Sequence, residues 1–382
     1  MTATATRPAP RATASARAGT VVPLAAAVLL LSGLGLVMVL SASSVQALRE
    51  YGSSWLFFRR QLLYLGIGGA AMIVTTRVDY RVWARLALPL LGCTIAGLVA
   101  VLVPGVGVTV SGSTRWIDLG ITQVQPAEFA KLAVLVFGAD LLARRHDRME
   151  DAGAILKPML LVFGVVGVLV MLEPDMGTTM VVASIVGALL FLGGTPMAWM
   201  VSLGLGGGML GMVVALAEPY RRARMLSFVD PWADAGNTGY QVVQSLVGIG
   251  SGQLKGVGLG ASRAKWGFLP NAHTDFIFAI VGEELGLIGA LFVLLLFIVI
   301  AFFGVRAAFD APDRFGGLLA AGVTAWITCQ ALINIGAVVG VLPVTGVPLP
   351  FVSYGGSSLI VLLAATGILL NVARAGAHHR RA

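Results

Sequence analysis

Residues 276–304 read FIFAIVGEELGLIGALFVLLLFIVIAFFG, and this stretch decides the fold class. Its only charged residues are Glu283 and Glu284. A helix of about 20 predominantly apolar residues crosses the hydrocarbon core of a bilayer. Strands of a transmembrane barrel would instead be short and would alternate apolar with polar residues. The stretch therefore predicts a membrane-spanning helix that carries two adjacent acids.

The composition of the whole chain agrees with this interpretation. Of the 382 residues, 57% are A, V, I, L, M, F, W, Y or C, and a further 49 are glycine. Soluble domains reach only about 45–50% with glycine counted. Charged residues make up 12% of the chain, against about 25% in soluble domains. Because a soluble fold cannot bury this much apolar surface and disorder requires the opposite balance, we expect an all-α integral membrane protein.

Ten apolar runs are interpreted as helical spans. They cover residues 21–41, 61–76, 84–104, 126–143, 156–172, 177–194, 197–217, 276–304, 316–340 and 355–373. No internal repeat is visible, so residues 20–374 are expected to form one membrane domain, with a large extracytoplasmic loop, 218–275, between spans 7 and 8. Ten spans place both termini on one side of the membrane. The segments on that side hold 15 Lys and Arg, against 10 on the other side, and this bias favours cytoplasmic termini.

The two ends of the chain are interpreted as tails. Residues 1–19 contain three arginines and no acids, together with many Ala, Thr and Pro. This composition resembles a transit peptide, but the apolar run that follows directly is too long for a typical signal sequence. We therefore interpret 1–19 as a disordered cytoplasmic tail before an uncleaved first span, and 375–382 as a basic cytoplasmic tail.

Charge, cysteine and histidine content exclude several classes of partner. The net charge is +8, but the basic residues are spread through the loops between spans, so an anionic membrane or lipid is expected and not a nucleic acid. The two cysteines, Cys93 and Cys329, lie inside apolar runs and are expected to pack there. The four histidines lack paired metal-ligand spacing, so no metal site is predicted.

The loop 218–275 is the most informative stretch for function. It is too polar and glycine-rich to span the membrane and too apolar for a free linker, so an interfacial, partly re-entrant segment is expected. Its glycines do not indicate a dinucleotide site, because no strand precedes them; turns or close backbone approach to a ligand explain them better. Two interpretations of its bases remain open, a solvated loop or an outward site for a phosphate or pyrophosphate. These bases are Arg221, Arg222, Arg224, Lys255, Arg263 and Lys265.

Asp275 lies where this loop meets the eighth span. It could be a helix N-cap, since a Thr-Asp pair before an apolar run is a common helix start. It could also be a general base at the membrane surface. Glu283 and Glu284 follow about 12–14 Å deeper at 1.5 Å per residue. Acids inside a span are candidates for function by default, although a structural pairing with a base is the alternative.

Three further groups could carry chemistry. Glu128 and Lys131 are three residues apart, so they share one helical face and form either an internal ion pair or the wall of a polar cavity. Arg115 lies in an outer loop, where a guanidinium can meet a headgroup. Glu173-Pro174-Asp175 is an outer turn that either binds a cation or caps the sixth span.

Several motifs, taken together and in this order, resemble the SEDS family, whose members include FtsW, RodA and SpoVE. The resemblance covers nearly the whole chain apart from both tails. The motifs are TRWIDLG (114–120), QPAEFAK (125–131), EPDMG (173–177), GYQVVQS (239–245), KWGFLPNAHTDFIFA (265–279), GEELG (282–286) and LPVTGVPLPFVSYGGSS (342–358). The last of these alone indicates a rigid re-entrant turn.

The resemblance implies a ten-span inner-membrane glycosyltransferase. Such an enzyme polymerises lipid II, a disaccharide-peptide on an undecaprenyl pyrophosphate, and works with a class B penicillin-binding transpeptidase. The catalytic Asp of the family aligns with Asp275. Arg115, Glu128, Lys131, Lys265 and Glu283 are expected to contact the substrate. No cofactor is implied by the residues, and a divalent cation, Mg²⁺ or Mn²⁺, stays open.

Within the family, the motifs SASSVQA (41–47) and YGSSWLFFRRQ (51–61) resemble FtsW, the division enzyme, more than RodA, the elongation enzyme. Action at the septum with other division proteins is therefore expected. Ser111 and Asn271 depart from the family pattern, which usually has Asn and Glu there. Two other functions stay open: a lipid II flippase, which would predict symmetry between halves, and a scaffold, which leaves the intramembrane charges unexplained.

Overall fold

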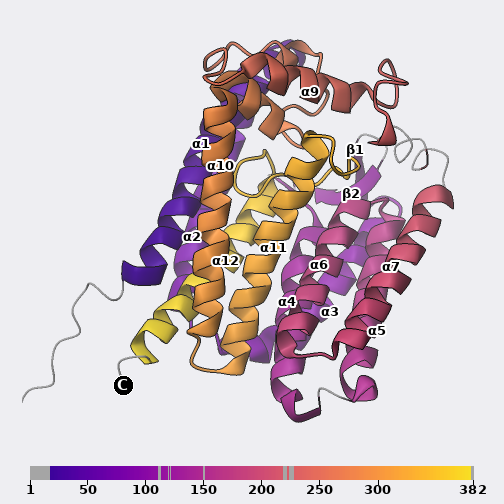
Figure 1. Ribbon diagram of the computed structural model, residues 1–382, viewed down its shortest axis with the longest axis vertical. Helices are drawn as coiled ribbons and strands as arrows, with labels where there is room; N and C mark the ends of the chain where they lie inside the picture. The colour runs from indigo at the N-terminus through magenta and orange to yellow at the C-terminus, as the bar shows by residue number, and fades with distance from the viewer. Residues whose placement is uncertain are drawn as a thin grey trace, which may run out of the picture.

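The computed structural model describes residues 18–379 except 111, 112, 119, 121, 149, 150, 218–221 and 223–227. The described helices form one bundle, with a short helix, α9, lying across one end of it (Figure 1). The α-helices are α1 (Ala18–Tyr51), α2 (Leu56–Arg77), α3 (Val82–Leu102), α4 (Pro126–Arg144), α5 (Ala152–Leu172), α6 (Met176–Gly193), α7 (Met197–Ala217), α9 (Tyr240–Gly252), α10 (Ile277–Phe309), α11 (Arg314–Val338) and α12 (Gly356–His379). Two 3₁₀ turns, η2 (His146–Arg148) and η3 (Ala264–Trp266), complete the helical part.

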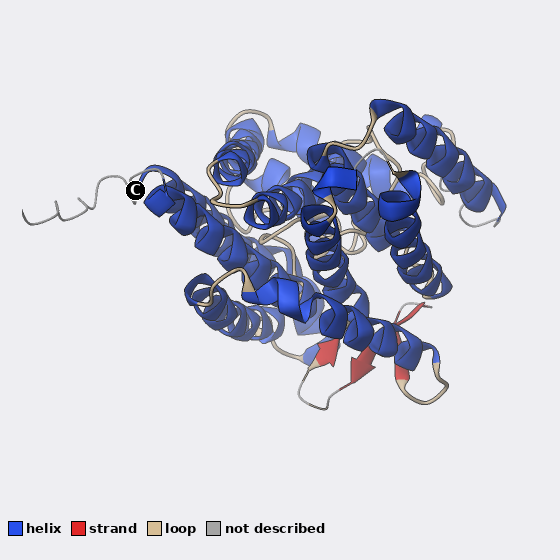
Figure 2. Ribbon diagram, turned by 90° about the horizontal axis from the view of Figure 1, so that it is seen from below, coloured by secondary structure: helices blue, strands red, loops and turns tan. Residues whose placement is uncertain are grey.

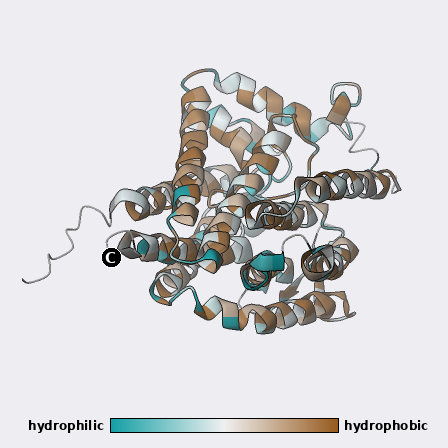
Figure 3. Ribbon diagram, turned by 60° about the horizontal axis from the view of Figure 1, so that its bottom comes forward, coloured by the Kyte–Doolittle hydropathy of each residue, from teal (hydrophilic) through white to brown (hydrophobic). Residues whose placement is uncertain are grey.

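The all-α membrane architecture predicted from the composition is confirmed. Seven of the described helices are long and apolar enough to cross a membrane, and apolar residues predominate along them (Figure 3). Helix α4 lies in a predicted span but carries Glu128, Lys131, Asp140 and Arg144. The exact number of ten spans stays a prediction.

Both ends of the described chain lie at the opposite end of the bundle from α9 (Figure 1). This agrees with termini on one side of the membrane, and the cytoplasmic assignment stays a prediction. Residues 1–17 of the predicted N-terminal tail and residues 380–382 lie outside the described part. Helix α12 continues to His379, so part of the predicted C-terminal tail is helical.

Helix α10 is broken near its outer end. Gly286 has φ 66° and ψ −165° inside the helix. The nine residues before it are nearly all buried, whereas the part after it exposes large apolar side chains such as Leu287, Ile288 and Leu291. The sequence does not indicate the break, because a glycine is tolerated inside a helix. The first part of α10 is therefore an interior segment and the second part faces lipid.

A small antiparallel sheet, which the sequence analysis did not predict, lies in the outer loop after α3. Its strands are β1 (Gly107–Val110), β2 (Ser113–Asp118) and β3 (Gln123–Val124), in the order β1-β2-β3. Trp116 pairs with Val108, and Ile117 pairs with Val124. The sheet lies at one edge of the bundle (Figure 2). It fixes Arg115 in a strand.

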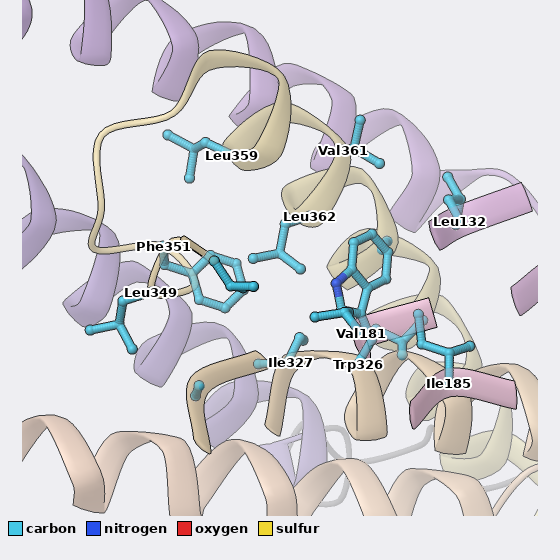
Figure 4. Packing of buried hydrophobic residues seen from close by; sticks show 14 of the residues in the cluster. Leu132, Val181, Ile185, Trp326, Ile327, Leu349, Phe351, Leu359, Val361 and Leu362 are labelled. Carbon is cyan, nitrogen blue, oxygen red and sulfur yellow. The ribbon is translucent and has the colours of Figure 1, made fainter. Parts of the chain in front are cut away.

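The core brings the segment between α11 and α12 against the middle of the bundle. Figure 4 shows Trp326 and Ile327 of α11 among apolar side chains of α6, α12 and the 349–351 turn. Trp326 is fully buried, and so are Leu349 and Phe351 within a few per cent. The 342–355 turn therefore packs into the bundle through its buried residues 347 and 349–353, as the predicted re-entrant segment requires. Val341, just before this turn, is exposed.

Candidate active site

Asp275 lies in the turn just before α10, and it is half-buried. The N-cap position of α10 is Phe276, and no side chain forms a cap hydrogen bond there. The N-cap residue of α10 is therefore Phe276 and not Asp275.

Backbone contacts on two sides hold the main chain at Asp275. The Asn334 side-chain amide of α11 donates to the carbonyl oxygens of Asp275 and Val347, both at 2.7 Å. A Cβ added at Gly346 would lie 3.6 Å from the Asp275 Oδ2 atom, and Gly346 has a φ of +75°. A side chain at position 346 would therefore touch the carboxylate at ordinary contact distance, and the positive φ would strain the turn.

The residues just before Asp275 are tied to the turn before α12. Ser353 Oγ donates to the Thr274 carbonyl at 2.5 Å, and the Tyr354 backbone N–H donates to the His273 carbonyl at 2.9 Å. Gln61 of α2 in turn donates to the Ser353 carbonyl at 3.1 Å. Helix α11 and the turn before α12 thus hold the 273–275 backbone, and α2 holds that turn.

His273 is a packing residue in this arrangement. Its ring lies 4.8 Å from the Phe57 ring and 5.6 Å from the Tyr354 ring. Burial lowers the pKa of His273 to about 4, so the imidazole is neutral at pH 7. The structure favours the interpretation as a structural loop histidine, since a neutral ring cannot tune Asp275 by its charge.

The predicted pair in α4 is an ion pair deep in the bundle. Lys131 Nζ lies 2.8 Å from Glu128 Oε1, and neither side chain is more than 3% exposed. Lys131 Nζ also donates to Gln330 Oε1 at 3.3 Å and lies 5.5 Å from the Trp326 ring centroid. The second Glu128 oxygen has no partner among the described residues. The pair is therefore both an internal ion pair and part of a larger polar network.

That network reaches Asp275 through two amides of α11. Gln330 donates to the Pro348 carbonyl at 2.9 Å, and Asn334, one turn later, donates to the neighbouring Val347 carbonyl and to Asp275. The sequence analysis missed both amides. Their spacing of four residues inside an apolar span was the available signal, because it places two polar groups on one face.

Arg115 contacts the Glu173–Asp175 turn. Its Nε atom donates to the Glu173 carbonyl at 2.9 Å, a second guanidinium nitrogen donates to the Pro174 carbonyl, and a third lies 3.8 Å from Asp175 Oδ2. Asp175 accepts from the Thr178 backbone N–H at 3.0 Å. Of the two interpretations of this turn, the cap of the sixth span is therefore confirmed, and the guanidinium is anchored on it.

Lys265 and Glu283 belong to another cluster. Lys265 Nζ lies 3.5 Å from Glu284 Oε1, and Glu283 accepts from the Arg263 backbone N–H at 2.8 Å. The structure therefore brings Asp275, Glu128 and Lys131 into one network, and it places Arg115 and Lys265 in two other groups of contacts.

The two departures from the family pattern have different outcomes. Asn271 adopts a φ of +57°, a region that Asn tolerates better than most residues. Ser111 lies outside the described residues.

In the part of the chain that the structure describes, no three His, Cys, Asp or Glu side chains are grouped in a way that could hold a metal ion.

Comparisons with known proteins identify relatives along nearly the whole chain. The model of the FtsW, RodA and SpoVE family, described as "Cell cycle protein", matches residues 22–378. Stage V sporulation protein E of Bacillus subtilis is 44% identical over 348 residues, covering 91% of this chain and 94% of the relative. The probable peptidoglycan glycosyltransferase FtsW of Thioalkalivibrio sulfidiphilus is 46% identical over 357 residues, covering 92% and 88%.

Solved structures share the fold. A chain from a peptidoglycan synthase complex that coordinates polymerization and crosslinking matches with a TM-score of 0.75 at 30% identity, covering 92% of this chain and 96% of that one. The rod shape determining protein RodA of Thermus thermophilus matches with a TM-score of 0.68 at 28% identity, covering 92% and 95%.

Proposed function

Because the chain belongs to the FtsW, RodA and SpoVE family of cell cycle proteins, we propose that it polymerises lipid II into glycan strands during septal wall synthesis. Asp275 is the proposed general base. The relatives named probable peptidoglycan glycosyltransferase support the activity.

Chain growth requires a sugar hydroxyl to attack an anomeric carbon that carries a lipid pyrophosphate. The hydroxyl is a poor nucleophile until its proton is removed, so one positioned base is the minimum requirement. The leaving pyrophosphate is already a stable anion, and it requires positive charge nearby more than a second proton donor. One carboxylate with nearby cations can therefore support this reaction.

One observation carries the assignment of the base. The backbone of Asp275 is held by Asn334 at 2.7 Å, and its half-buried carboxylate lies just before α10, beside the glycine at position 346. A fixed main chain and a partly accessible carboxylate are what general-base catalysis requires, since the base must lie within reach of the proton that it removes.

The cations have different proposed roles. Arg115, whose side chain is 21% exposed, is the proposed contact for the pyrophosphate. Lys131 is almost fully buried beside Glu128, so the pair is proposed to support the substrate-binding site from inside the bundle. Lys265 and Glu283 are expected from the sequence to contact substrate, but their buried contacts with the protein favour a positioning role.

The Asp275→Asn variant tests the base. Because Asn keeps the shape of Asp and is as good at a helix start, the variant is expected to fold and insert normally. General-base removal typically costs about 10²–10⁴-fold in rate, so purified Asp275→Asn given labelled lipid II in detergent should make almost no glycan. Asp230→Asn, which changes an exposed carboxylate in the same loop, is the matched control and should remain active. Robust polymerisation by Asp275→Asn would overturn the proposed mechanism.

The same assay separates the alternative functions. Detergent offers no second compartment, so a lipid II flippase or a pure scaffold would make no glycan there. If the wild-type protein shows no polymerase activity, either alone or together with a class B transpeptidase, one of these alternatives is therefore favoured.

The division role and the partners are also proposals. The structural match to a peptidoglycan synthase complex supports a penicillin-binding partner, and the FtsW relatives support the septum over a RodA-type elongation role. The protein is proposed to lie in the inner membrane with both termini in the cytoplasm, among other division proteins. Depletion in cells decides between the two roles, because loss of a division enzyme gives filaments and loss of an elongation enzyme gives round cells.

A further inference from the structure

Two buried carboxylates lie on α10 directly before its break. Glu283 and Glu284 are 2% and 1% exposed. A buried carboxylate is costly unless hydrogen bonds or cations stabilise it. The partners of these two come from α1 and from the segment just before and within η3, so the carboxylates join three parts of the chain.

Glu283 binds the turn that leads into η3. Its Oε2 atom accepts from Ser262 Oγ at 2.5 Å, and its Oε1 atom accepts from the Arg263 backbone N–H at 2.8 Å. The Ala264 backbone N–H lies 3.4 Å from Oε2. Both oxygens are thus satisfied by one short stretch of the loop.

Glu284 binds α1 and the same stretch. It accepts from Ser41 Oγ at 2.6 Å and from the Ser262 backbone N–H at 3.2 Å, and Lys265 Nζ lies 3.5 Å from its Oε1 atom. Lys265 Nζ also donates to Ser41 Oγ at 3.3 Å and to the Gly260 carbonyl at 2.5 Å. The ammonium thus makes two hydrogen bonds and one ion pair within the protein. We call Ser41, Ser262, Lys265, Glu283 and Glu284 the clasp.

The clasp closes a loop that carries Asp275. Residues 262–265 and 283–284 meet at its base, and Asp275 lies between these two ends in the sequence. The far side of the loop is held by Asn334 and Ser353. The loop that carries Asp275 is therefore held at two places, by α11 and the 342–355 turn at Asp275 and by the clasp at its base.

A second set of contacts locks the base of this loop. The backbone N–H groups of Val257 and Gly258 donate to the carbonyls of Glu283 and Glu284 at 3.0 and 3.1 Å. In return, the Leu287 backbone N–H donates to the Gln253 carbonyl at 2.8 Å. The loop thus takes up backbone groups that the break in α10 releases, as non-helical backbone at membrane depth requires.

From this geometry we propose that the clasp positions Asp275, and that Lys265, Glu283 and Glu284 are positioning residues and not ligands of the pyrophosphate. This replaces the substrate-binding role predicted for Lys265 and Glu283 from the sequence. The inference rests on the proposed function, since Asp275 is the base that the clasp would position. A small displacement of a catalytic group can cost about 100-fold in rate.

Lys265→Met and the double variant Lys265→Met/Glu284→Gln test the role of the lysine. The single change leaves the Glu284 carboxylate buried without its cation, so kcat should fall by about tenfold or more, while KM for lipid II stays unchanged. The double change removes both charges and keeps an acceptor for Ser41, so kcat should recover with KM again unchanged. Lys255→Met, which changes an exposed lysine of the same loop, is the matched control and should behave as the wild type.

A spin label on Phe268→Cys, with both native cysteines replaced by alanine, gives a readout independent of activity. Phe268 is exposed and lies inside the closed loop. The label should be more mobile in Lys265→Met than in the wild type or the double variant. A raised KM for lipid II in both Lys265→Met and Lys265→Met/Glu284→Gln would overturn the inference. The inference would also be overturned if Lys265→Met changed neither the mobility of the label nor kcat. A wild-type protein that does not polymerise lipid II would instead overturn the proposed function, and the label would still test the clasp.

Discussion

At the scale of single residues, Glu173 is the most unusual group outside the spans. It is fully buried, and neither carboxylate oxygen has a hydrogen-bond partner among the described residues. Burial, and then the nearby charge of Asp175, raise the pKa of Glu173 from 4.5 to about 8, although Arg115 opposes the shift. The carboxyl is therefore protonated at neutral pH in the folded protein.

This gives a pH dependence with a defined sign. Between pH 4.5 and 8 the folded state holds a proton that the unfolded state has lost, so stability falls as pH rises, by at most about 1.4 kcal/mol per pH unit. Glu173→Gln should remove this part of the dependence. From pH 6 to pH 9, the melting temperature in detergent should therefore fall more for the wild type than for Glu173→Gln. Equal falls in both proteins would show that Glu173 ionises normally.

At the scale of elements, the places of the helices were predictable and the contacts between elements were not. Apolar runs give both ends of α4 and α7 within a residue, because burial in lipid depends on local composition. They do not give the end of α1, which continues to Tyr51 beyond the predicted end at residue 41, because the added turns are more polar. The break in α10 was not predictable, since it depends on a loop that packs against Gly286. The sheet was not predicted either, because TRWIDLG contains no long alternating pattern.

The candidate site divides in the same way. Asp275, Glu128 and Lys131 stand out in the sequence because charge inside or beside a span is rare. The pairing of Lys265 with Glu284 depends on the folded path of the loop, and no spacing rule connects the two positions. Gln330 and Asn334 were missed because uncharged amides attract less notice in an apolar run.

The contact between the loop and α10 has its own test at Gly256. Its φ is +80°, and a Cβ there would lie 2.1 Å from the Glu284 carbonyl. Gly256→Ala should destabilise the protein by strain of about 1–3 kcal/mol and, in addition, by this clash. Gly258→Ala is the matched control, because Gly258 has a φ of +103° and no atom within 4 Å of an added Cβ. Melting temperatures lowered equally by both changes would show that position 256 is not packed against the break.

At the scale of the whole molecule, the buried pair in α4 connects the centre of the bundle to the outer site. Helix α4 packs against α3, α6 and α11, so its charges are surrounded by other helices. Lys131 is linked by Gln330 to the 342–355 turn, and that turn is linked by Asn334 to Asp275. A change at the pair can therefore alter both the stability of the bundle and the geometry at Asp275.

Single and double changes at this pair separate the two effects. Lys131→Met leaves the Glu128 carboxylate buried without its cation, which should cost about 3–5 kcal/mol. Glu128→Leu/Lys131→Met leaves no buried charge, so its melting temperature in detergent should recover most of that loss. Its polymerisation of lipid II should nevertheless stay below that of the wild type. Gln330 Oε1 keeps the Trp326 Nε1 donor at 2.8 Å but loses the ammonium at 3.3 Å, which weakens the support that Gln330 gives to the 342–355 turn. A double variant that is both stable and fully active would show that the pair serves folding alone, and that the position of Asp275 is set by the clasp and Asn334 without help from α4.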